Sequence, residues 1–179
     1  MIPRAALAAD QRIYGVVVGL VTKVEDPEGL GRVEIELPWY ASGYRRWARV
    51  AHLSAGPGYG STWVPEVKTE VLVLFAHGDM RWPYVVGCLY SAVDKPQHSR
   101  TSSSDIRSLR TPAGSELSFD ETNGEITLKT PNGASVTLTE SSGEVTVKAT
   151  SKITLSAPDV HIEATAGSVT VKGSQIALN

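Results

Sequence analysis

The sequence has one cysteine, four histidines and no long apolar run, and each shortage excludes a class of protein. Cys88 has no partner for an internal disulfide or for a thiolate metal site. It lies in an apolar run, so we expect it to be a small buried residue. No run of 18 apolar residues predicts a membrane-spanning helix. Residues 1–9 lack the basic start and apolar core of a signal peptide, which predicts synthesis in a bacterial cytoplasm.

An excess of one charge is also lacking. The net charge is −2, and residues 1–108 carry +1, from 12 basic and 11 acidic side chains. A broad basic surface for nucleic acid is therefore not expected. One group nevertheless mixes aromatic and cationic residues, as single-strand binders do. It consists of Trp39, Tyr40, Tyr44, Arg45, Arg46 and Trp47.

Aromatic residues are nearly absent from the second half of the chain. All four Trp and all six Tyr lie at or before Tyr90, and beyond it only Phe119 is aromatic. From Leu109 onward, 20 of 71 residues are Ser or Thr, with 8 acidic and 5 basic residues. The composition therefore predicts two parts, of which only the first has an aromatic core.

The first part, residues 12–92, contains five short strand patterns separated by turns rich in Gly and Pro. These patterns lie at 13–21, 31–37, 47–53, 71–75 and 84–90, and none has a helical period. They favour a small Greek-key barrel of the oligonucleotide/oligosaccharide-binding (OB) type. Residues 1–11 are expected to be an N-terminal arm. Residues 93–108, with Pro96 and a Thr-Ser-Ser-Ser run, are expected to be a linker.

The second part, residues 109–179, repeats one short β unit eight times. Each unit has an apolar–x–apolar pair, and successive pairs start 9, 10, 9, 8, 7, 9 and 7 residues apart. The alternation is typical of strands with one buried face, and turn formers such as Asn123-Gly124 separate the pairs. The expected core residues are Leu117, Phe119, Ile126, Leu128, Val136, Leu138, Val145, Val147, Ile153, Leu155, Val160, Ile162, Val169, Val171, Ile176 and Leu178.

A unit this short cannot bury its own apolar face, so neighbouring units must cover it. Two inward residues per strand are too few to fill a wide single-chain solenoid. They suit a slender prism in which several copies each supply a wall, with few free strand edges. The sequence therefore predicts an all-β chain in which the OB-fold Greek-key barrel is followed by an intertwined homotrimeric β-helix.

The order of these segments resembles a known family. The stretches GRVEIELPWY, WARVAHLSAGPGYGSTWVPEVKTEVLVLF and HGDMRWPYVVGCLYSA are similar to the OB domain of contractile-injection spike proteins, which include phage baseplate assembly protein V and the type VI secretion spike VgrG. Members of that family join this domain to a C-terminal trimeric β-helix. The resemblance implies a structural spike at the centre of a baseplate, below the tail tube. Such a spike is driven through a target cell envelope when the sheath contracts.

The resemblance also implies partners within a phage tail or another injection particle. No tube-like domain precedes the barrel, so a separate baseplate hub protein is expected to link it to the tail tube. Residues 43–46 are expected to form a loop that contacts this hub or a neighbouring subunit, through Tyr44, Arg45 and Arg46. The chain ends directly after its last apolar pair. We expect this blunt end to be a platform for a PAAR-type tip protein, formed by Gln175, Ile176, Ala177, Leu178 and Asn179.

Patterns for catalysis, cofactors or metals are weak. His77 and Asp79 flank a glycine on a turn, and Glu34 and Glu36 share one side of a strand, so both pairs are expected to be ordinary surface groups. No G-x-S-x-G elbow or P-loop is present. Some members of the family bind iron through an H-x-H pair near the tip, but here His161 is followed by Ile162-Glu163. We therefore expect no enzyme activity, no cofactor and no metal site.

Two other functions stay open from the sequence. A trimeric adhesin or carbohydrate-binding fibre could use the same β-helix, but it should carry a C-terminal head with exposed aromatic residues. None follows Phe119. An OB-fold nucleic-acid-binding protein with a repetitive tail would leave residues 109–179 disordered. A strong, heat-resistant β signal from that segment would favour the spike.

Overall fold

The computed structural model describes residues 12–40 and 43–176 of the chain, and they form an all-β protein. The chain divides into two compact units between Pro96 and Gln97. The stretch 93–108, predicted as a linker, is therefore shared, because Ile106 already begins a strand of the second unit. The expected N-terminal arm, residues 1–11, lies outside the described residues.

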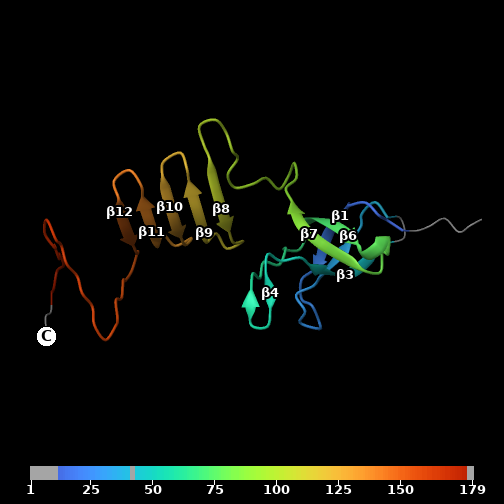
Figure 1. The fold of residues 1–179 in the computed structure, drawn as a ribbon, viewed down its shortest axis with the longest axis horizontal. Helices are drawn as coiled ribbons and strands as arrows, with labels where there is room; N and C mark the ends of the chain where they lie inside the picture. Colours follow the sequence, from blue (N-terminus) through green and yellow to red (C-terminus); the bar gives the residue numbers. More distant parts are fainter. Residues whose placement is uncertain (1–11, 41–42, 177–179) are drawn as a thin grey trace, which may run out of the picture. The chain divides into compact units, whose positions relative to one another are not determined.

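The first unit contains a closed five-stranded barrel (Figure 1). Its strands are β1 (Val17–Lys23), β2 (Val33–Glu36), β3 (Arg45–Val50), β6 (Glu70–Phe75) and β7 (Pro83–Leu89). They close in the order β1-β2-β3-β7-β6, with β3 and β7 parallel and the other pairs antiparallel. The predicted OB-type barrel is thus confirmed. The glycine-rich loop after β3 adds a small hairpin, β4 (Ala55–Gly56) with β5 (Tyr59–Gly60), and a 3-10 turn at Ala76–Gly78 precedes β7.

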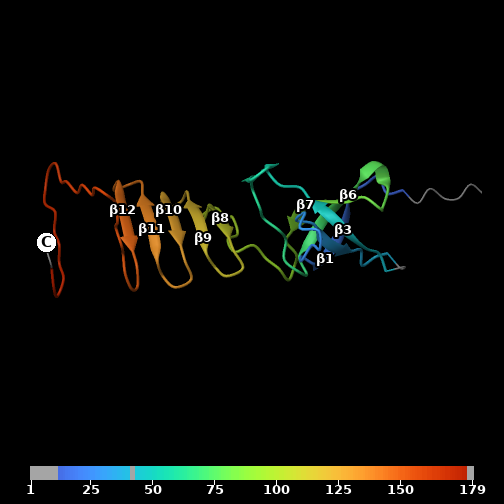
Figure 2. The ribbon, with the colours of Figure 1, turned by 90° about the horizontal axis from the view of Figure 1, so that it is seen from below.

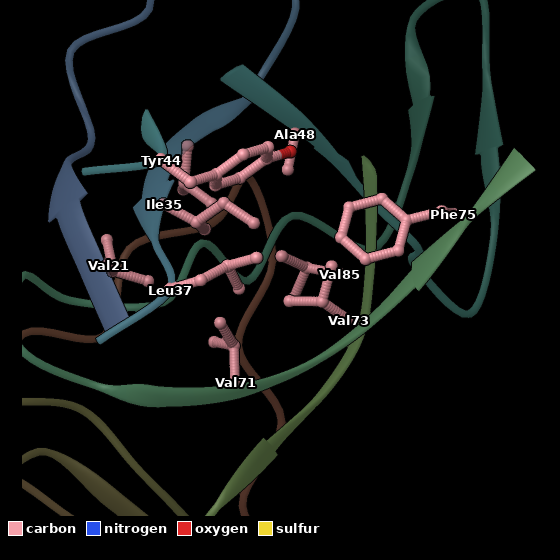
Figure 3. Packing of buried hydrophobic residues seen from close by; sticks show 10 residues of the cluster. Val21, Ile35, Leu37, Tyr44, Ala48, Val71, Val73, Phe75 and Val85 are labelled. Atoms are coloured by element: carbon pink, nitrogen blue, oxygen red, sulfur yellow. The ribbon is translucent and has the colours of Figure 1, made fainter. Parts of the chain in front are cut away.

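Alternating residues of the strands fill the barrel (Figure 3). Val33 and Ile35 on β2 and Val71 and Val73 on β6 are fully buried, because every second side chain of a strand faces the interior. Aromatic rings close one part of this core in edge-to-face contacts that run from Tyr40 to Tyr44 and on to Phe75.

One carboxylate organises the turn between β1 and β2. The Asp26 side chain accepts hydrogen bonds from the backbone N–H groups of Glu28, Leu30 and Arg32. The Arg32 guanidinium binds the same carboxylate with two further hydrogen bonds. These donors, the Arg32 side chain foremost, hold the pKa of Asp26 far below its usual value. These hydrogen bonds therefore fix the shape of the turn.

Cys88 does not occupy the buried position expected for it. It pairs with Val71 near the end of β7 but is exposed. A shift of register between Leu72 and Val73 leaves Val86 of β7 without a partner on β6, and the residues that follow it on β7 are exposed. The apolar sequence around Cys88 gave no sign of this irregularity.

The second unit contains a five-stranded antiparallel meander, in which each strand pairs with its neighbour in sequence (Figures 1 and 2). Its strands are β8 (Ile106–Arg110), β9 (Glu116–Asp120), β10 (Glu125–Lys129), β11 (Ser135–Thr139) and β12 (Glu144–Lys148). The last four strands contain the first four predicted apolar pairs. All four connecting turns carry a glycine with positive φ, at Gly114, Gly124, Gly133 and Gly143, a conformation that other residues rarely adopt.

After β12, residues 149–176 contain no strand within the single chain. The spacing of the apolar pairs gives a physical reason. In the meander the pairs start 9 or 10 residues apart, which allows a five-residue strand and a turn of four or five residues. From Val145 on, the spacing becomes 8, 7, 9 and 7, and most of these intervals are too short for another such hairpin.

Candidate interaction surface

The apolar residues of the meander lie in two continuous rows on one face of its sheet. The first row joins directly opposed residues of all five strands, namely Leu109, Leu117, Leu128, Val136 and Val147. The second row joins Phe119, Ile126, Leu138 and Val145. Directly opposed residues in a sheet point to the same side, so these nine side chains form one surface. We call it the apolar face.

The apolar face is uncovered in the single chain. Leu128, Val145 and Val147 are 55%, 63% and 54% exposed, although strand valines such as Val71 and Val73 are fully buried in the barrel. Exposed apolar surface of this extent on a soluble protein marks a site of association. Eight of the sixteen predicted core residues lie on this face. Leu109 also belongs to it, but the repeat analysis missed it because β8 was assigned mostly to the linker.

The opposite face of the meander is polar and is formed by a row of small hydroxyl residues. Ser118, Thr127, Thr137 and Thr146 lie directly opposite one another on β9 to β12. The hydroxyl oxygens of Thr127 and Thr137 are 3.5 Å apart. Threonine suits an exposed strand because its branched side chain favours the extended backbone and its hydroxyl stays hydrated. The sheet therefore has one face for water and one for a partner.

A buried carboxylate ties the segment before β8 to this polar face. Glu116 is 2% exposed, and His98 Nε2 lies 2.8 Å from its Oε1. Arg110 Nη1 and Lys129 Nζ lie 3.1 and 3.4 Å from the other carboxylate oxygen. The hydrogen bond to His98, assisted by Lys129, lowers the pKa of Glu116. Sequence analysis missed this cluster because its four members are scattered from residue 98 to residue 129.

The remaining predicted core residues are not brought together in the single chain. Ile153, Leu155, Val160, Ile162, Val169, Val171 and Ile176 are all exposed, and Leu178 lies outside the described residues. His161 is also exposed, and its Nε2 lies 3.0 Å from Glu163 Oε2. Of the expected tip platform the structure describes Gln175 and Ile176, while Ala177, Leu178 and Asn179 lie outside the described part.

Half of the stretch expected to form a contact loop, residues 43–46, belongs to a strand. Arg45 and Arg46 begin strand β3, and the Tyr44 side chain is buried in the barrel, where its hydroxyl donates a 2.7 Å hydrogen bond to the Met80 carbonyl. Burial raises the pKa of Tyr44 to about 12. Arg45 and Arg46 remain exposed. The same burial removes Tyr44 from any row of stacking aromatics for a nucleic acid.

The carboxylates considered for catalysis each have an ordinary structural partner. The Asp79 carboxylate is bound by Arg81 at 2.6 Å, and this hydrogen bond lowers the pKa of Asp79 to about 2. Glu34 is bound by Thr22 and Lys23, whereas Glu36 is bound by Arg45. Over residues 12–40 and 43–176, no three His, Cys, Asp or Glu side chains come together in a way that could hold a metal.

Comparison with known families accounts for both units. Residues 17–90 match the type VI secretion system/phage-baseplate injector OB domain. Residues 107–166 match the phage baseplate V C-terminal trimerisation domain. The chain belongs to the phage baseplate V family of injector proteins. The second match covers the meander and continues into the residues that form no strand in the single chain.

Several curated relatives are spike proteins of type VI secretion systems. The chain is 31% identical over 135 residues to spike protein VgrG3 of Vibrio cholerae, a match that covers 68% of this chain and 13% of that relative. It is 35% identical over 106 residues to spike protein VgrG4b of Pseudomonas aeruginosa, covering 53% and 13%. It is also similar to the actin cross-linking toxin VgrG1 of Vibrio cholerae, with 32% identity over 123 residues that cover 59% and 11%. The chain thus spans about an eighth of these relatives.

Hydropathy adds one further observation. In the part of the chain that the structure describes, no helix is long and apolar enough to cross a membrane.

Proposed function

We propose that three copies of this chain assemble into the central spike of a contractile injection particle. The apolar face carries this proposal, because its nine side chains form continuous rows and lack a cover in the single chain. Three such faces turned toward one axis would bury the rows against one another. The match to a trimerisation domain and the similarity to spike proteins support this arrangement.

The segment after β12 completes the needle between chains. Residues 149–176 keep the alternation of apolar and polar residues but find no partner strand in their own chain. An extended segment with unpaired backbone groups is stable when strands of other chains supply the hydrogen bonds. The proposed needle therefore begins with three meanders, one from each chain, and continues toward the C-terminus as an intertwined β-helix.

The partners follow from the role of a spike. A baseplate hub protein would bind the barrel and link it to the tail tube. In the contact proposed for Tyr44, Arg45 and Arg46, the exposed Arg45 and Arg46 supply the accessible groups, and Tyr44 supports them from the core. A PAAR-type tip protein would bind Gln175 to Asn179, and the target cell envelope would be met transiently during injection.

The proposed role is mechanical and requires no enzyme activity. Each candidate catalytic carboxylate already pairs with a neighbouring cation, and a spike acts by transmitting axial force. Ladder hydrogen bonds between strands about 4.8 Å apart would carry that force. The particle itself would be a phage tail or a related injection machine assembled in the bacterial cytoplasm.

The oligomeric mass of the full chain tests the proposal. Light scattering should give about 57 kDa, three times the 19.1 kDa of one chain. Circular dichroism should show a β signal that persists on heating, since intertwined strands separate only when all three chains unfold. A folded particle of 19 kDa at micromolar concentration would overturn the proposal.

A further inference from the structure

The two ends of the meander strands carry opposite charges. The end at which β9 turns into β10 and β11 into β12 is acidic, and its carboxylates are Asp120, Glu121, Glu125, Glu140 and Glu144. We call it the acidic rim. The other end carries Arg110, Lys129 and Lys148, and we call it the basic rim. Glu116 lies at the basic rim but is already bound by Arg110 and Lys129, and Arg107 lies at the acidic rim but is already bound by Asp105 and Glu121.

Two strands carry this polarity within their own sequence. Strand β10 reads Glu-Ile-Thr-Leu-Lys and strand β12 reads Glu-Val-Thr-Val-Lys, and both run from the acidic rim to the basic rim. The glutamate and the lysine of one strand are four residues apart, a separation of about 13 Å along an extended backbone. They are too far apart to form an ion pair with each other.

Lys129 lies directly opposite Glu116 and 3.4 Å from its carboxylate, but cross-strand neighbours do not neutralise the other three charges. Glu125 lies directly opposite Asp120, which is a like-charge pair. Both Glu144 on β12 and Lys148 at its other end lie opposite uncharged residues of β11. In the described part of the chain, neither Glu125, Glu144 nor Lys148 forms an ion pair.

We propose that the acidic rim of each chain pairs with the basic rim of the next copy, with Glu125 opposite Lys129 and Glu144 opposite Lys148. The inference rests on the proposed trimer and specifies which edges join. Under rotational symmetry the same strand of each copy lies at the same height, so the lysine end of β10 meets the glutamate end of β10 in its neighbour. A two-fold contact between identical rims would instead place acid against acid. The charges thus select a closed ring of copies that all point in one direction.

Charge reversal with rescue tests the pairing in the full chain. One variant, Glu144→Lys, places a lysine opposite Lys148 of the neighbouring copy, and a second, Lys148→Glu, places a glutamate opposite Glu144. Lys129 is left unchanged because it also binds Glu116. Like charges that face each other across an interface repel. We therefore expect either variant to raise the concentration at which the trimer dissociates by at least about tenfold at low salt, an effect that high salt should reduce. The variant with both changes restores opposite charges, and we expect it to recover the trimer.

A matched control separates rim pairing from total charge. Glu66→Lys changes the net charge as much as Glu144→Lys, but position 66 is exposed on the barrel unit. We expect this control to remain trimeric. Tryptophan fluorescence shows whether the barrel is still folded, since all four Trp lie in the first unit.

The outcomes distinguish this inference from the proposed function. A wild-type chain that is monomeric overturns the trimer and, with it, the rim pairing. A trimeric wild type whose rim variants dissociate no more readily than the barrel control overturns the rim pairing alone. Two rim variants that lose the trimer without recovery in the double variant also overturn the pairing. Loss in both, with recovery in the double variant, supports it.

Discussion

The barrel and the meander use the same alternation of residues but differ in what covers the apolar side. Val71 and Val73 on β6 are fully buried, because the barrel closes on itself. Val145 and Val147 on β12 are more than half exposed, because the meander is an open sheet. Alternation therefore identifies the face of a strand that must be buried. Whether the same chain or another chain buries that face depends on whether the sheet closes on itself.

The largest expected effect comes from making the apolar face polar. In the double variant Ile126→Asn and Leu138→Asn, two opposed residues of the second row lose their apolar side chains. Burial of such a side chain contributes roughly 1.5–3 kcal/mol, and a trimer would lose six of them. We expect light scattering to show loss of the trimer, while the barrel keeps its tryptophan fluorescence.

The same strands offer a matched control for this variant. Thr127 and Thr137 are also directly opposed, but they lie on the polar face. Thr127→Asn with Thr137→Asn should leave the trimer intact. Equal loss of the trimer in both double variants would contradict the assignment of one face to the interior.

A cavity in the barrel core should have the opposite effect: it should lower the stability of the barrel and leave the trimer intact. Ile35 is fully buried on β2, and Ile35→Ala should lower the free energy of barrel unfolding by about 2–5 kcal/mol. Denaturant unfolding followed by tryptophan fluorescence measures this loss. The trimeric mass should not change, since the meander buries its apolar face independently. A variant that becomes monomeric would show that the two units depend on each other.

A smaller effect is expected at the buried carboxylate of the meander. Glu116→Gln leaves Arg110 and Lys129 without their carboxylate and weakens the contact with His98, at a cost of about 1–3 kcal/mol. Because the folded structure lowers the pKa of Glu116 below its usual value of 4.5, the ionised group stabilises the fold above that pH. This stabilisation is lost as the pH falls through the lower, folded pKa.

The pH dependence of unfolding gives the measurement for Glu116. Wild type and Glu116→Gln should differ in unfolding free energy near neutral pH and converge in acid. Glu121→Gln is the control, because its partner is the exposed Arg107. A constant difference down to the acid range would argue against an ionised Glu116 as the source of the stability.

The smallest effect is expected at an exposed ion pair of the barrel. The side chains of Arg45 and Glu36 are 61% and 32% exposed, so Arg45→Ala should cost about 0.2–1 kcal/mol. High salt should remove most of the difference, because it screens exposed charges. A larger loss that persists in high salt would mean that Arg45 supports the barrel by packing as well as by charge.

Much of the fold could be predicted because periodicity and turn chemistry are local. The five barrel strands and the strands β9 to β12 follow from apolar residues at every second position, and the turns between them from Gly, Asn and Pro. Strand β8 was missed because it has only Leu109 on the apolar face, opposite Leu117, and Arg107 takes the place of a second apolar residue. A strand with one apolar residue on the apolar face resembles a linker in sequence.

What could not be predicted depends on contacts between distant residues. Tyr44 is buried because it packs edge-to-face against Tyr40 and Phe75, and its position beside Arg45 and Arg46 suggested a surface instead. Arg110 and Lys129 reach Glu116 only when β8, β9 and β10 are in register, and His98 joins them from the segment before β8. Cys88 is exposed although it lies directly opposite the buried Val71, and no residue type near it indicates this. These features arise from pairing between strands, which a single sequence does not display.

The register of the meander also has a consequence for how such proteins change in length. A hairpin such as β11 with β12 adds two pairs of apolar residues to the apolar face and brings the chain back to the rim from which the hairpin started. Insertion or deletion of one hairpin would therefore lengthen or shorten the shaft by two strand spacings, roughly 10 Å, without altering its cross-section. The length of the shaft can therefore change in steps of one hairpin, which would match it to cell envelopes of different thickness.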